Sequence, residues 1–146
     1  MTKRTTGRRF MLPVAAAIVV IIACILTACG KSEFSATVLS EKRITIDAKN
    51  ADEDATSTVG ALEVKDGEKI TIDGDLKKGS VRVELFRTDG QQSMDQLPDM
   101  DGEPVMSANL NREDNCTGTV PAGNYSVRAT CLEKASGTVD IEVQQN

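Results

Sequence analysis

Hydrophobic and polar residues alternate along most of the chain beyond residue 33. In one segment, Ile44 and Ile46 alternate with Arg43, Thr45 and Asp47. A period of two places neighbouring side chains on opposite faces of a β-strand, so this pattern predicts a strand with one buried face. The same pattern predicts strands near residues 34–39, 43–47, 62–64, 69–73, 81–86, 106–110, 125–131 and 139–143.

Short turn motifs punctuate these segments. Asp66-Gly67 lies between two of them and is a strong hairpin signal. Other glycine-containing pairs are expected to end strands in the same way. These are Asp73-Gly74, Lys78-Gly79, Asp89-Gly90, Ala122-Gly123 and Ser136-Gly137.

The pattern predicts an all-β fold for residues 34–146. Strands separated by such turns, without a helical hydrophobic stripe, indicate an antiparallel β-sandwich of about seven to nine strands with a jelly-roll-like arrangement. Two polar segments are predicted to be loops, residues 49–57 and residues 88–104. The second is long and acidic, and irregular loops of that length are usually functional or disordered.

The N-terminal segment has a different character. Lys3, Arg4, Arg8 and Arg9 precede an apolar run over residues 11–26, which ends in small residues. This order is typical of a helical, cleaved signal peptide, here residues 1–28. A single membrane span is the alternative, although the run is shorter than the roughly 20 residues that a span needs.

The end of the apolar run is more specific. Leu26, Thr27, Ala28 and Cys29 form a sequence that resembles the lipobox of bacterial lipoproteins. The resemblance implies cleavage before Cys29 and attachment of diacylglycerol, with further acylation such as palmitate, to that residue. Residues 29–33 would then be a lipid-anchored tether at the cell membrane. Two or three acyl chains give stable anchoring, whereas one chain is marginal.

Two cysteines, Cys116 and Cys131, lie in the predicted sandwich. Exported proteins meet an oxidising environment, so we expect these residues to form a disulfide. Such a bond would stabilise the fold by about 3 kcal/mol. A pair of free thiols and a two-cysteine metal half-site are the alternatives.

The last 75 or so residues resemble a known type of small domain. The segments Leu-Lys-Lys-Gly-Ser-Val-Arg-Val (76–83), Thr-Val-Pro-Ala-Gly-Asn-Tyr-Ser-Val-Arg (119–128) and Gly-Thr-Val-Asp-Ile-Glu-Val (137–143) are similar to strands of pre-peptidase C-terminal jelly-roll domains. The resemblance implies an accessory or binding module that has no catalytic residues.

Tyr125 follows a turn at residues 121–124 and enters a predicted strand. Greek-key sandwiches often place a tyrosine there, with its hydroxyl bonded to nearby backbone. We therefore expect Tyr125 to have a structural role, with a ligand contact as the alternative.

The acidic loop is a candidate calcium site. Its carboxylates are Asp95, Asp99, Asp101 and Glu103. Hard cations bind clustered oxygen ligands, but the EF-hand register would put Leu97 and Ala108 where carboxylates are required. We therefore expect no cofactor, with an irregular structural calcium site as the alternative.

The composition narrows the function. The chain has no His, no Trp, one Tyr and a net charge of -5. It therefore lacks His-dependent nucleophilic machinery and an aromatic platform, and its acidity disfavours nucleic acid. We expect a non-catalytic, lipid-anchored binding or accessory module at the bacterial envelope, whose partner is a protein or a wall polymer. The alternatives are a calcium-stabilised structural or adhesive domain and a small solute-binding lipoprotein.

Overall fold

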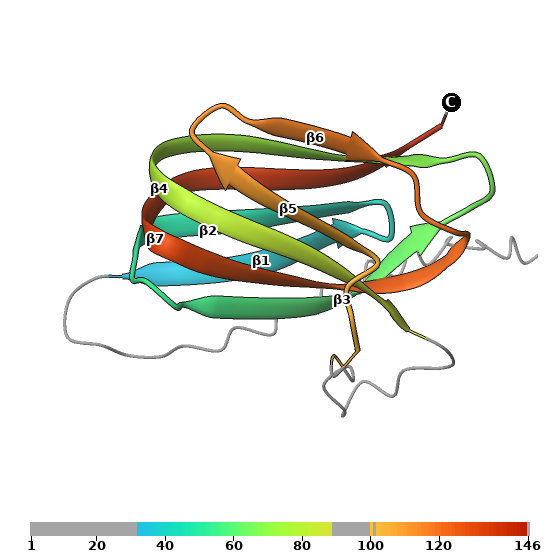
Figure 1. Cartoon of the computed structure of the whole chain (residues 1–146), viewed down its shortest axis with the longest axis horizontal. Coiled ribbons are helices and arrows are strands. Elements are labelled where there is room, and N and C mark those ends of the chain that lie inside the picture. The colour runs from blue at the N-terminus through green and yellow to red at the C-terminus, as the bar shows by residue number, and fades with distance from the viewer. Residues whose placement is uncertain (1–31, 89–99, 101, 146) are drawn as a thin grey trace, which may run out of the picture.

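The computed structural model describes residues 32–88, 100 and 102–145. Seven strands, all paired in antiparallel fashion, make up this part of the chain (Figure 1). They are β1 (Glu33–Ser40), β2 (Arg43–Ala51), β3 (Thr56–Val64), β4 (Lys69–Thr88), β5 (Met106–Asn111), β6 (Asn115–Gly118) and β7 (Gly123–Gln144). The predicted signal peptide, with its lipobox, lies outside the described residues.

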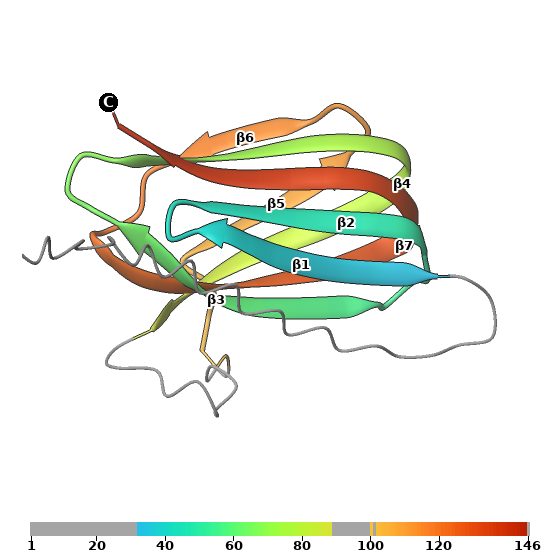
Figure 2. The same ribbon diagram turned by 180° about the vertical axis from the view of Figure 1, so that it is seen from behind.

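The strands form a two-layer sandwich because β4 and β7 are long and bend midway (Figures 1 and 2). Layer one contains β1, β2, the second half of β7, the first half of β4, and β6. Layer two contains β3, the first half of β7, the second half of β4, and β5. The prediction of an antiparallel, jelly-roll-like sandwich is thus confirmed.

Both long strands bend at the same place, which we call the bend (75–80 of β4 and 133–137 of β7). The register of the β4–β7 pair shifts repeatedly here, and such bulges curve a strand. Gly79 has a φ of 79°, and a Cβ on it would lie 2.3 Å from the carbonyl oxygen of Lys134. A Cβ on Gly137 would lie 2.2 Å from the carbonyl oxygen of Asp75. Glycine therefore lets the two backbones approach closely.

The bend corrects the predicted strand ends. Gly74, Gly79 and Gly137 were expected in turns that end strands, but β4 and β7 continue through all three. Because the partner strand bends at the same point, the ladder resumes after each bulge. The predicted turn at Gly67, in contrast, separates β3 from β4.

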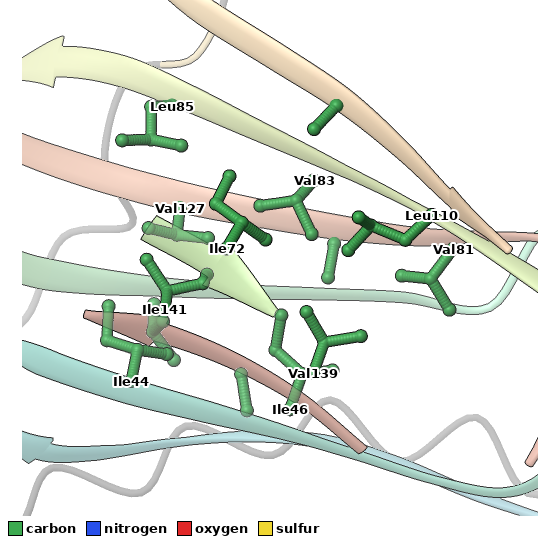
Figure 3. Close-up of a cluster of buried hydrophobic side chains, with 14 of the residues drawn as sticks. Ile44, Ile46, Ile72, Val81, Val83, Leu85, Leu110, Val127, Val139 and Ile141 are labelled. Carbon is green, nitrogen blue, oxygen red and sulfur yellow. The ribbon is translucent and has the colours of Figure 1, made fainter. Parts of the chain in front are cut away.

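The hydrophobic positions of the alternating pattern form the core between the layers. Ile44, Ile141 and Ile72 lie side by side across layer one and are fully buried. Val83 and Val127 of layer two belong to the same buried cluster (Figure 3). Sequence periodicity thus identified the inner face of the strands that it predicted, whereas the short strand β6 was not predicted.

The predicted loop at residues 49–57 was largely wrong. β2 extends to Ala51 and β3 begins at Thr56, which leaves residues 52–55 as the connection. Ala51 and Ser57 are buried, because small side chains fit at these interior positions. The Ser57 hydroxyl accepts a hydrogen bond from the backbone N–H of Ala36 at 3.1 Å. This bond satisfies a donor on the outer edge of β1.

We call the end of the sandwich opposite the bend the distal end. An ion pair connects two turns there. The Lys42 ammonium donates to Glu68 Oε2 at 2.6 Å and to the carbonyl of Glu63 at 2.9 Å. The Glu68 side chain is only 7% exposed and also accepts from the backbone N–H of Lys65. Lys42 thereby ties the β1–β2 hairpin to the β3–β4 turn.

The ion pair makes stability depend on pH. The hydrogen bond from Lys42, followed by that from the Lys65 backbone, lowers the pKa of Glu68 from its ordinary value of 4.5. A lowered folded-state pKa stabilises the protein above the unfolded-state pKa, and this stabilisation is lost as pH falls through the folded-state value. We expect Glu68→Gln to be less stable than wild type near neutrality and this deficit to shrink as pH falls below 4.5.

Urea unfolding at several pH values measures this difference. Glu41→Gln removes a neighbouring carboxylate whose side chain is exposed and serves as the control. A deficit for Glu68→Gln that stays constant down to about pH 3 would contradict the assignment.

Candidate functional site

A shallow polar groove lies on the outer face of layer one, next to the bend. Its volume is about 640 Å³, and it opens widely to solvent. It crosses β1, β2, β7 and β4 and is lined by Glu33, Ser35, Asp47, Ala48, Lys49, Asp75, Lys77, Ser136, Gly137 and Thr138.

Strand register positions the polar groups of the groove. Asp47 is paired with Thr138, and Thr138 with Asp75, so the two carboxylates lie in one row across three strands. At one side, Lys49 Nζ lies 3.9 Å from Glu33 Oε2, and both side chains are mostly exposed. Such an exposed pair contributes little to stability. Alternating carboxylates, ammonium groups and hydroxyls suit a polar ligand that carries both charges.

The groove continues around the bend toward the β5–β6 turn. A second depression of about 640 Å³ shares Asp75 and Lys77 and reaches Arg112, Glu113 and Asp114. Backbone bonds hold the turn against β4, because Leu76 N–H donates to the Arg112 carbonyl at 3.0 Å. Although this region is acidic, the described residues contain no group of three carboxylates or cysteines placed to hold a metal.

The four carboxylates of the predicted calcium site come from the acidic loop before β5. Asp95, Asp99 and Asp101 lie outside the described residues, and Glu103 is exposed before β5. The calcium site therefore stays a prediction. None of the described segments forms a helix with the length and apolar character of a membrane span.

Tyr125 lies at the start of β7 and is fully buried. Its hydroxyl donates a hydrogen bond to the carbonyl of Pro121 at 2.5 Å, across the turn that leads into the strand. Burial raises the pKa of the phenol, and the positive charge of Arg87 partly opposes this shift. The side chain thus joins the β6–β7 connection to the core.

The predicted disulfide is absent, and Cys116 and Cys131 are free thiols. Cys116 lies on β6 beside Ile72 in layer one, whereas Cys131 lies on β7 beside Val81 in layer two. Facing layers are about 10 Å apart, and a disulfide needs Cα atoms within roughly 4.4–6.8 Å. The oxidising environment expected for an exported protein favoured a disulfide, but the strand positions keep the two sulfur atoms apart.

The two thiols should react at different rates. Burial, and then the charge of Asp52, raises the pKa of Cys131 to about 11, so about one thiol in a thousand is ionised at pH 8. We expect iodoacetamide, without reductant, to label half-buried Cys116 first and Cys131 only after unfolding. Peptide mass spectrometry resolves the two sites. Failure of both to react in denaturant would contradict the free thiols.

Sequence reasoning missed a contact on the outer face of layer two. Alternation with the buried residues Val83 and Leu85 predicts that Phe86 points outward, but its side chain is only 3% exposed. The Arg128 guanidinium lies 4.6 Å from the centre of its ring and also bonds Glu84 at 3.0 Å. The register that pairs Glu84 with Arg128 sets this contact, and no local sequence signal reveals a pairing across 44 residues.

Comparison with known proteins gives fold-level likenesses only. No protein-family profile matches the sequence, and no curated protein is similar to it in sequence. The structure is similar to the cupin domain of Drosophila melanogaster CENP-C (11% identity, 87% of this chain and 76% of that chain, TM-score 0.38). It is also similar to the hydroquinone 1,2-dioxygenase PnpCD, with 20% identity over 75% of this chain and 61% of that chain and a TM-score of 0.37. A CBM4 structure is similar with 11% identity over 77% of this chain and 76% of that chain and a TM-score of 0.37. Likenesses this weak carry no inference about function.

Proposed function

We propose that this protein is a bacterial lipoprotein, anchored by lipid on Cys29, whose sandwich is a non-catalytic binding or accessory module outside the cytoplasm. The observation that carries the proposal is the sequence Leu26-Thr27-Ala28-Cys29, placed directly after a basic segment and an apolar run. Cleavage before Cys29 would leave the described fold intact, because β1 begins at Glu33.

Two features support a binding role. The chain contains no His, which excludes the commonest general base and His-dependent nucleophiles. The groove beside the bend is open and exposes both carboxylates and ammonium groups. Enzyme sites usually lie in clefts that exclude water from the reacting atoms, whereas an open face of mixed charge suits contact with a large polar partner. A surface protein or a wall polymer of the envelope fits this description.

Substitution of Cys29 tests the anchor. We expect Cys29→Ala to abolish palmitate labelling and to leave an uncleaved precursor, because the sulfur that would carry diacylglycerol is gone. Wild-type protein should partition into detergent as a shorter, lipid-bearing chain. Metabolic labelling and intact-protein mass spectrometry measure both effects.

Cys24→Ala is the matched control, since it removes a cysteine from the same apolar run but not from the lipobox. It should be processed and labelled like wild type. Wild-type protein recovered without lipid from the cytosol would refute the proposal.

A further inference from the structure

The proposed anchor also fixes which end of the sandwich meets the membrane. Resting on the proposed lipid at Cys29, we propose that the sandwich stands end-on on the bilayer, with the bend against the lipid headgroups. We define the bend end as the bend together with residue 33, residues 49–54 and the β5–β6 turn at 111–114. The partner of this end is a lipid surface with zwitterionic headgroups.

The first argument is the length of the tether. Only residues 30–32 separate Cys29 from Glu33, the first residue of β1. Each residue of extended chain spans at most about 3.6 Å, so the two Cα atoms lie within about 14 Å. The Ser32 hydroxyl donates to Asp52 Oδ2 at 3.1 Å, so this tether residue is bonded to the bend end. The acyl chains enter the bilayer within that distance.

The second argument is the position of Glu33 in the fold. β1 begins at the end where β4 and β7 bend and runs toward the distal end (Figures 1 and 2). Its eight residues, at about 3.3 Å each, place the distal end roughly 25 Å further from the anchor. In the end-on orientation, the Lys42–Glu68 ion pair and the β3–β4 turn therefore face away from the membrane.

The third argument is charge, and it concerns the kind of lipid. On the outer face of layer one carboxylates outnumber cations: Glu33, Asp47, Asp73, Asp75, Asp140 and Glu142 against Arg43, Lys49, Lys69 and Lys77. The bend end is also acidic, because it contains the carboxylates of Glu33, Asp52, Glu53, Asp54, Asp75, Glu113, Asp114 and Glu133 and the cations of Lys49, Lys77, Lys78, Arg112 and Lys134. An anionic leaflet would therefore repel both surfaces. The interspersed charges of the bend end can instead contact both the phosphate and the ammonium of a zwitterionic headgroup.

The orientation places the polar groove at the membrane surface. Asp75 and Lys77 belong both to the groove and to the bend end. A protein or wall polymer that uses the groove must therefore lie within or next to the headgroup layer.

Photo-crosslinking of the full, lipidated chain tests the orientation. p-Benzoylphenylalanine replaces either Lys77 at the bend or Lys65 in the distal turn, both of which are exposed lysines. Each protein is incorporated into phosphatidylcholine–phosphatidylethanolamine vesicles and irradiated, and lipid adducts are counted by mass spectrometry. We expect at least fivefold more adduct at position 77. Equal yields, or more at position 65, would overturn the orientation.

The mass of the N-terminal peptide separates this inference from the proposed function. A chain without lipid on Cys29 would overturn the proposed function and the orientation together. A lipidated chain with equal yields would overturn the orientation alone.

A longer tether provides the matched control. A Gly/Ser segment of about 20 residues, inserted between Lys31 and Ser32, adds roughly 25 Å of mean reach. We expect the ratio of adducts at positions 77 and 65 to fall toward one. A ratio unchanged by this insertion would contradict the argument that the short tether sets the orientation.

Discussion

Gly79→Ala is expected to lower the free energy of unfolding by about 2–5 kcal/mol. The φ of 79° is unfavourable for alanine and costs about 1–2 kcal/mol. The added methyl would also meet the Lys134 carbonyl oxygen at 2.3 Å and the Ala135 Cα at 2.7 Å. These are backbone atoms, so β7 must move away from β4 at the bend. Overpacking of this kind typically costs a further 1–3 kcal/mol or so.

Gly67→Ala separates the cost of the positive φ from the cost of the close backbone approach. Gly67 has a similar φ of 81°, but a Cβ there meets nothing within 4 Å. We expect it to cost about 1 kcal/mol, from backbone conformation alone. Urea unfolding of residues 32–146, followed by circular dichroism, measures both variants. Equal losses would show that β4 and β7 do not approach closely at the bend.

The bend also marks the limit of prediction from sequence. A period of two depends only on neighbouring residues, and it identified the buried face of nearly every strand. Whether Gly79 ends a strand or bends it depends on β7, which pairs from more than 50 residues away. A glycine permits both outcomes locally, so the sequence predicted a turn where the chain continues.

The same limit applies to the functional groups. Tyr125 could be interpreted from sequence because its acceptor, the Pro121 carbonyl, is four residues away. The Lys42–Glu68 pair and the Arg128–Phe86 contact depend on distant segments, and each residue alone looks like an ordinary surface position. The groove likewise arises where four strands lie side by side, and the period-two pattern does not determine the order of these strands.

The cysteines show how a general rule can mislead. The expected environment favoured a disulfide, and the alternation correctly placed Cys131 on the buried face. The rule that exported cysteines form disulfides carries no information about the distance between the two residues. Cys116 and Cys131 belong to different layers, and only the topology reveals this.

Ile141→Ala is expected to cost about 2–5 kcal/mol of unfolding free energy. Ile141 is fully buried in the centre of layer one, between Ile44 on β2 and Ile72 on β4 (Figure 3). Truncation removes three carbon atoms from this row and leaves a cavity that two neighbouring strands hold open. Because Val, Ile, Leu and Phe make up only about a fifth of residues 29–146, few other contacts compensate.

Ile141→Val should cost about 0.5–1.5 kcal/mol, which keeps the measurement possible if the alanine variant fails to fold. Val105→Ala is the surface control, because Val105 is 45% exposed and its N–H bond to the Leu85 carbonyl does not involve the side chain. It should change stability by less than about 0.5 kcal/mol. If Ile141→Val and Val105→Ala had equal effects, the isoleucine row would not be the centre of the core. A graded loss at position 141 alone would instead show that layer one is stabilised by the packing of this row against layer two.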